Sequence, residues 1–158
     1  MTGGGREIER KFLVDRARLP PLLGGRRLVQ GYLAERPTVR VRIADDGTDS
    51  AHAWLTIKGP GLIDRAELEY EIPVVDARVL LEMAHAQLEK TRYELDHAGK
   101  RWEVDVFAGA LDGLLLAEIE LEAIDEPFEI PTWIGGEVSH DARYSNGALA
   151  RSQRVPSA

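Results

Sequence analysis

Cysteine is absent from this 158-residue chain, which excludes disulfide bonds and thiolate metal sites. The lack of cysteine fits a reducing cytosol, so we expect a cytoplasmic protein. No apolar run approaches the ~20 residues that span a bilayer. The opening segment 1–5 also lacks the apolar core of a signal peptide. We therefore expect no membrane partner.

Basic residues are fewer than acidic ones, 20 against 27, which gives a formal net charge of -7. A nucleic-acid binder that works by bulk electrostatics is usually basic, so nucleic acid is not an expected partner. Any bound anion must be held by a local concentration of cations or by metal. The length predicts a single domain over residues 1–158, with flexible ends at 1–5 and 152–158.

Turn signals divide the chain into short segments, a pattern typical of an antiparallel barrel or sandwich. Three segments are predicted to be helical, at 15–23, 77–88 and 141–151, with Asp76 as the N-cap of the second. The eight predicted strands lie at 6–14, 27–34, 38–45, 51–59, 65–73, 88–96, 100–107 and 114–123.

Charged and apolar residues alternate along nearly every predicted strand. Every second residue of a strand points to the same face, so Arg40 and Arg42 share a face, as do Glu118 and Glu120. An ordinary sheet with one solvated face would also alternate, but such faces usually mix in neutral polar residues. Here the cations gather on some strands and the carboxylates on others. That segregation favours an enclosed lumen, which in an eight-stranded barrel is wide enough for one small ligand.

The charged faces suit a metal-bound polyphosphate. Hard cations such as Mg²⁺ prefer oxygen ligands, and carboxylates two residues apart on a strand converge on one point. The suitable pairs are Glu7 with Glu9 and Glu118 with Glu120. Arginine and lysine match phosphate oxygens. The cations that could surround a chain of phosphates are Lys11, Arg40, Arg42, Lys58, Lys90 and Arg92, and the supporting carboxylates are Glu69, Glu71 and Asp105.

The same residues resemble a known family, the CYTH domain, also called the triphosphate tunnel metalloenzymes. Glu7-Ile8-Glu9-Arg10-Lys11 is similar to the ExExK signature of this family. That signature alone arises by chance in charged strands, but further matching elements follow in order through nearly the whole chain. They are Gln30-Gly31-Tyr32-Leu33, Arg40-Val41-Arg42, Ile57-Lys58-Gly59, Glu69-Tyr70-Glu71, Lys90-Thr91-Arg92-Tyr93, Trp102-Glu103-Val104-Asp105-Val106-Phe107, Glu118-Ile119-Glu120 and Arg143-Tyr144-Ser145-Asn146.

The resemblance implies a mainly β fold of the α+β kind: an eight-stranded antiparallel closed barrel with a few flanking helices. It implies chemistry on a small-molecule triphosphate that depends on Mg²⁺ or Mn²⁺. The implied metal ligands are Glu7, Glu9, Glu118 and Glu120, with Glu7 nearer a second metal or the attacking water. Glu7, Lys11 and Tyr32 carry the implied catalytic roles, although a phenol such as Tyr32 is a poor base. Arg143 joins the implied phosphate-binding cations.

Several short bacterial members of this family act on inorganic tripolyphosphate, so we predict a triphosphatase that yields pyrophosphate and phosphate. Three alternatives stay open: a class IV adenylate cyclase that makes cyclic AMP from ATP, a thiamine triphosphatase, and a non-catalytic module that binds polyphosphate or a nucleotide. The intact glutamate pairs count against the last. A homodimer is also left open. Trp54, Trp102 and Trp133 are expected to be packing residues rather than stacking platforms.

Overall fold

The computed structural model describes residues 5–45, 47 and 50–157. The predicted flexible leader therefore lies almost wholly outside the described residues, as does Ala158 at the other end. The strands are β1 (Arg6–Val14), β2 (Arg26–Glu35), β3 (Thr38–Asp45), β4 (His52–Lys58), β5 (Asp64–Ile72), β6 (Ala86–His97), β7 (Lys100–Phe107), β8 (Leu115–Glu120) and β9 (Ile134–Glu137). The helices are α1 (Val74–Met83) and α2 (Asn146–Ser152), with 3₁₀ turns η1 (Gly109–Leu111) and η2 (Ala142–Tyr144).

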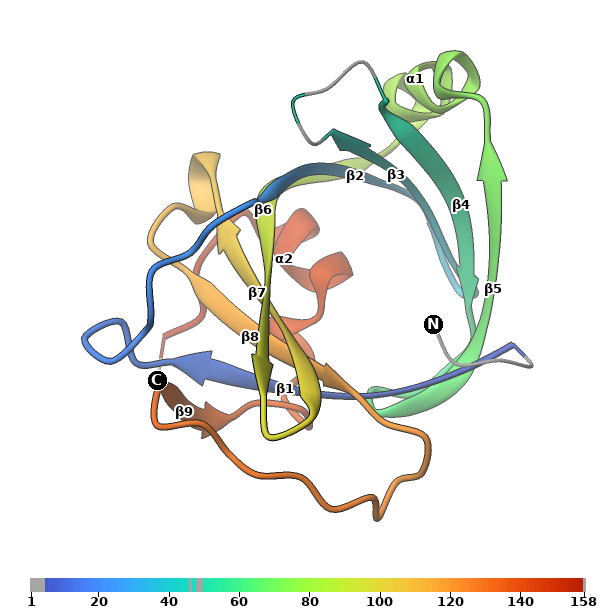
Figure 1. The fold of residues 1–158 in the computed structure, drawn as a ribbon. Coiled ribbons are helices and arrows are strands. Elements are labelled where there is room, and N and C mark those ends of the chain that lie inside the picture. Colours follow the sequence, from blue (N-terminus) through green and yellow to red (C-terminus); the bar gives the residue numbers. More distant parts are fainter. Residues whose placement is uncertain (1–4, 46, 48–49, 158) are drawn as a thin grey trace.

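The strands form one antiparallel sheet in the order β5-β4-β3-β2-β6-β7-β8-β1-β9, and an additional β5–β1 pairing closes it into a barrel (Figure 1). β1 makes this closure with two different partners. Its first three residues, 6–8, pair with β5, and residues 9–13 pair with β8. The prediction of an eight-stranded closed barrel, β1 to β8, is confirmed.

One strand was not predicted. β9 is four residues long, contains Gly135 and Gly136, and has no alternating pattern. It forms because the C-terminal half of β1 offers an open edge, where Val14 pairs with Ile134 and Phe12 with Glu137. A Cβ at Gly135 would lie 3.2 Å from the carbonyl oxygen of Leu13, so the close approach of the two chains favours glycine there.

The helix predictions were only partly right. Residues 15–23 form a turn and irregular chain rather than a helix. α1 begins at Val74 with Pro73 as its N-cap, which places Asp76 in the first turn instead of at the cap. The predicted third helix divides into η2 and α2, and α2 begins where the Ser145 hydroxyl accepts a hydrogen bond from the Ala148 N–H. No helix among the described ranges is long and apolar enough to cross a membrane.

The alternation assigns the charged face of each strand to the inside of the barrel and the apolar face to the outside. On the outside, α1 covers β3 and β4 through a cluster that includes Val41, Ala53 and Ala77. The irregular chain around Phe128 and Trp133 covers β1, β7 and β8. The outer face is therefore covered partly by one helix and partly by irregular chain.

α2 packs against the inner side of the barrel. Its residue Leu149 joins a buried cluster with Tyr32, Leu88, Phe107 and Leu116. These four share the faces of their strands with lumen-facing polar residues. The apolar cluster thus fills one part of the lumen and leaves the rest polar.

Candidate active site

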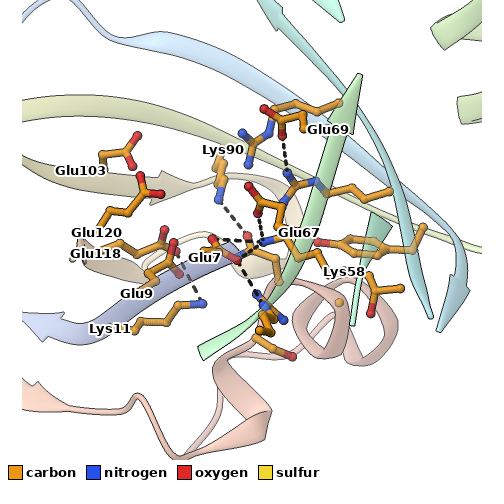
Figure 2. Close-up of a pocket in the computed structure, with 18 of the residues that line it drawn as sticks. Glu7, Glu9, Lys11, Lys58, Glu67, Glu69, Lys90, Glu103, Glu118 and Glu120 are labelled. Atoms are coloured by element: carbon orange, nitrogen blue, oxygen red, sulfur yellow. Dashed lines mark hydrogen bonds and ion pairs between the residues drawn. The ribbon is translucent and has the colours of Figure 1, made fainter. Parts of the chain in front are cut away.

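The polar part of the lumen is a cavity of about 320 Å³ to which every strand from β1 to β8 contributes at least one side chain. A volume of this size is at the lower end of the range for small-molecule sites. Its walls are mostly glutamate, lysine and arginine. Figure 2 shows Glu9, Glu103, Glu118 and Glu120 gathered on one side, with lysines reaching toward them.

The acidic side is built by the pairing of β1 with β8, which places Glu9 opposite Glu120 and Lys11 opposite Glu118. Burial, followed by the charges of Glu118 and Glu7, raises the pKa of Glu9 well above its ordinary value. Burial also opposes ionisation of Glu118, but Lys11 and Arg92 outweigh it and hold the pKa of Glu118 well below its usual range. Two carboxyl groups with opposite pKa shifts therefore lie close together, Glu118 with a lowered pKa and Glu9 with a raised one.

Glu7 has different neighbours from Glu9, although the two residues share a face of β1. Its carboxylate lies 3.0 Å from the Lys58 ammonium and 3.1 Å from the Arg65 guanidinium. Burial opposes ionisation, but the charges of Lys58 and Arg65 prevail and lower the pKa of Glu7. Lys58 also lies 3.3 Å from Glu67. Glu7 thus holds two cavity cations in place.

Arginines concentrate positive charge on the opposite wall, on β3. Burial, then repulsion by Arg40 and Arg92, lowers the pKa of Arg42 to about 9. Arg42 donates to Gln30 at 3.0 Å, and Arg40 donates to Thr56 at 3.3 Å, so neutral groups supply part of their hydrogen bonding. The buried Arg40 Nε has no hydrogen-bond partner among the described residues. Cations that repel one another in this way are what an anionic ligand would stabilise.

A buried network of ion pairs joins the neighbouring strands β6 and β7. Asp105 accepts two hydrogen bonds from Arg92, at 2.7 and 2.8 Å, and one from Lys90 at 2.7 Å. Lys90 also donates to Asn146 of α2 at 2.8 Å. Burial lowers the pKa of Lys90 to about 7, although Asp105 acts in the opposite direction. Arg92 reaches on to Glu118 at 3.2 Å and so connects the network to the acidic side.

The acidic side is chemically suited to a divalent cation. No three acidic or histidine side chains of the described part of the chain are already arranged as a metal cage. However, the pKa of Glu9 is raised because burial and two neighbouring carboxylates disfavour its charge. A cation bound among Glu9, Glu118 and Glu7 would remove that repulsion, and carboxylate oxygens are the ligands that Mg²⁺ and Mn²⁺ prefer.

The structure brings together most of the residues selected from the sequence. Those that line the cavity are Glu7, Glu9, Lys11, Tyr32, Arg40, Arg42, Lys58, Glu69, Lys90, Arg92, Glu118 and Glu120. The buried Asp105 lies behind them, bound to Lys90 and Arg92.

Two predicted residues lie elsewhere. The Arg143 side chain is 56% exposed and binds Asp141 at 2.7 Å, and it also donates to the Ser157 carbonyl. Arg143 therefore faces away from the cavity, because Asp141 two residues earlier captures both its N–H and its guanidinium. The Glu71 side chain is 62% exposed at the end of β5 and lies 2.8 Å from His52. It does not support the cavity cations.

Several cavity residues were not identified from the sequence. Arg65 lies on the same face of β5 as Glu67 and Glu69, so the alternation that selected Glu69 could also have identified it. Asn146 and Arg151 could not be found in this way, because only the position of α2 brings them to the cavity. Arg151 there lies 3.3 Å from Glu35 of β2.

Comparison with known proteins gives consistent matches over almost the full length. A family model described as CYTH domain matches residues 5–151. An inorganic triphosphatase of Acetivibrio thermocellus is 41% identical over 153 residues, which cover 94% of this chain and 95% of that protein. An inorganic triphosphatase of Nitrosomonas europaea is 40% identical over 153 residues, with 92% and 97% coverage.

Solved structures agree in fold. The inorganic triphosphatase NE1496 superposes with a TM-score of 0.65 at 35% identity, covering 96% of this chain and 97% of that one. The putative adenylyl cyclase HpAC1 from Hippeastrum gives a TM-score of 0.58 at 16% identity, with 95% and 97% coverage. At that identity the second likeness concerns the fold alone.

Proposed function

This chain belongs to the CYTH domain family, and from that premise we propose that it is a metal-dependent triphosphatase. Its proposed substrate is inorganic tripolyphosphate, which it hydrolyses to pyrophosphate and phosphate. The observation that supports this most is the enclosed cavity with Glu9, Glu118 and Glu120 on one side and Arg40 and Arg42 on the other. A triphosphate needs cations for its oxygens, and its hydrolysis needs charge stabilisation at the transferred phosphoryl group.

In this proposal the arginines and lysines of the cavity bind the phosphate oxygens and align the chain of phosphates. Glu9, Glu118 and Glu120 would hold a Mg²⁺ or Mn²⁺ ion, with Glu7 toward a second ion or the attacking water. A divalent ion bound there supplies positive charge beside the reacting phosphoryl group. Water oxygen forms a bond to the terminal phosphorus, the bridging P–O bond breaks, and pyrophosphate leaves.

Lys11 and Tyr32 are the remaining proposed catalytic residues. The Lys11 ammonium lies 3.5 Å from Glu118 and donates to the Tyr144 carbonyl at 3.0 Å. From this position we expect it to offset charge on the leaving pyrophosphate. The buried Tyr32 hydroxyl accepts a hydrogen bond from Gln30 at 3.3 Å. Its proposed contribution is as a relay for the proton of the attacking water.

The direct test is a product assay on the purified chain. We expect phosphate release from tripolyphosphate in the presence of Mg²⁺ or Mn²⁺, and its loss on chelation by EDTA. Cyclic nucleotide should be scored in parallel with ATP as substrate. Cyclic AMP formation with little phosphate release from tripolyphosphate would contradict the triphosphatase proposal and favour a cyclase. Tight tripolyphosphate binding without turnover across several metals would favour a non-catalytic module.

Metal binding is expected to release a proton from Glu9. Burial and the neighbouring carboxylates raise the pKa of Glu9 and so favour its protonated form in the metal-free protein, whereas a metal ligand must be deprotonated. The affinity for Mg²⁺ should therefore weaken as the pH falls, because the proton competes with the metal. Titration calorimetry in two buffers of different ionisation enthalpy would measure up to about one proton released per site. The Glu9→Gln variant should lose this release, and wild-type binding without any release would contradict the assignment.

Two further expectations concern the setting of the protein. We propose that the chain works in the cytoplasm, where its lack of cysteine makes it indifferent to the reducing conditions. The homodimer stays a prediction, which sedimentation velocity of the purified chain would test.

A further inference from the structure

An aromatic residue faces the lumen at the opposite end of β3 and β4 from α2. On β4, Thr56 donates to Glu69 and Lys58 donates to Glu7, so both side chains point inward. Trp54 is two residues before Thr56 and therefore lies on the same face. It pairs with Arg42 on β3 and with Glu71 on β5. This places Trp54 at the rim where β3 ends, β4 begins and β5 ends, the region beside α1 (Figure 1).

Trp54 is held in an aromatic pair rather than in the core. Its ring stacks with that of His52, with centroids 6.0 Å apart and an interplanar angle of 28°. His52 is itself fixed, because its Nδ1 lies 2.8 Å from a Glu71 carboxylate oxygen. By contrast, Trp102 is 0% exposed and Trp133 is 5% exposed, in one apolar cluster. Trp54 is half-buried and lies outside this cluster, whereas the expectation of a packing residue is confirmed for Trp102 and Trp133.

We propose that Trp54, with His52 and Glu71, forms a stacking subsite for the base of a nucleoside triphosphate. The triphosphate would occupy the cavity, so the inference rests on the proposed function. Directly opposed residues on antiparallel strands have Cβ atoms about 4.5–5.5 Å apart. Trp54 is therefore a direct neighbour of Arg42, and a base attached to a phosphate bound by Arg42 would lie next to the Trp54 ring. Stacking on an aromatic ring suits any planar base, because every base has a π face.

This arrangement gives inorganic and organic triphosphates different dependences on one residue. Tripolyphosphate ends at the phosphate-binding cations and does not reach the rim. A nucleoside triphosphate makes the same phosphate contacts and adds stacking on Trp54. Loss of one base–aromatic stack typically weakens binding by about tenfold or more. The test is therefore a comparison of two ligands rather than a single activity.

The kinetic experiment uses the β,γ-imido analogue of ATP with Mg²⁺ as a competitive inhibitor of tripolyphosphate hydrolysis. In Trp54→Ala, we expect the inhibition constant of the analogue to rise about tenfold, while the KM for tripolyphosphate changes less than about twofold. Trp54→Phe, which keeps an aromatic face, should retain most of the analogue binding. An unchanged inhibition constant in Trp54→Ala would overturn the subsite. An equal rise in both constants would overturn it too, because Trp54 would then serve only the Arg42 side chain.

A fluorescence titration decides the inference even if tripolyphosphate is not hydrolysed. Trp102 and Trp133 are buried away from the cavity, so a change in tryptophan emission on ligand binding reports mainly on Trp54. The imido analogue should quench this emission in the wild-type chain and not in Trp54→Phe. Tripolyphosphate should leave it nearly unchanged. Analogue binding without quenching, or no analogue binding at all, would overturn the proposal, whereas absent phosphate release with normal quenching would count only against the triphosphatase.

Discussion

Glu9→Gln is expected to lower metal-dependent phosphate release from tripolyphosphate by about 10²–10³-fold or more, while the melting temperature of the metal-free protein rises. Activity falls because an amide is a poor substitute for a carboxylate metal ligand. Stability rises because burial and the charges of Glu118 and Glu7 disfavour ionised Glu9 in the folded chain. A carboxyl whose pKa is raised on folding costs stability at every pH above its unfolded value, and glutamine removes that cost.

The opposite signs of these two effects separate a functional role from a structural one. A phosphate-release assay and a thermal melt at about pH 8 on the same sample measure both. Glu122→Gln is a matched control, because Glu122 is exposed just beyond β8 and does not line the cavity. The control should keep wild-type turnover and stability. Wild-type turnover in Glu9→Gln would show that the metal assignment is wrong.

Asp105→Asn is expected to lower the free energy of unfolding by about 3–5 kcal/mol, the usual cost of removing one partner from a buried charge network. The Asp105 carboxylate is fully buried and neutralises both Lys90 and Arg92, which are themselves buried. Asparagine keeps the shape but removes the carboxylate partner of Lys90. Arg92 keeps its ion pairs with Glu103 and Glu118 but loses the one with Asp105. Urea unfolding followed by fluorescence would measure the loss.

The loss in Asp105→Asn should depend on pH through Lys90. In the wild-type protein the pKa of Lys90 is lowered to about 7, and removal of the Asp105 charge lowers it further. Below pH 7 the wild-type chain gains a charged pair that the variant cannot form, so the difference in unfolding free energy grows as the pH falls. Asp96→Asn changes an exposed aspartate of the same hairpin and should stay within about 0.5 kcal/mol of wild type. An Asp105→Asn deficit no larger than this control would contradict the network.

Much of the barrel could be predicted because the alternation of charged and apolar residues indicates which side chains of a strand point into the lumen and which point outward. The predicted limits of β1, β3 and β7 match the structure to the residue, and these strands carry regular alternation between clear turn signals. The same alternation correctly places Glu9, Arg42, Arg92 and Glu120 in one cavity. The alternation also places Arg65 on the same face of β5 as Glu67 and Glu69, although Arg65 was not among the predicted site residues.

The features that were missed depend on contacts between distant parts of the chain. β9 has no strand pattern of its own and is ordered by the open edge of β1. The family resemblance implied that Arg143 binds phosphate, but the nearby Asp141 binds its guanidinium instead. The entry of Asn146 into the Lys90 network follows from the packing of α2 inside the barrel, which local sequence does not encode.

The double pairing of β1 has a consequence for how the chain reaches its native state. β1 is synthesised first, yet its partner β8 is the last strand of the barrel to be made. Such non-local pairing carries a high contact order, which predicts slow folding completed only after most of the chain has left the ribosome. Because Glu7 and Glu9 lie on that same strand, any transient opening of the β1–β8 pairing would separate the proposed metal ligands as well as open the barrel wall.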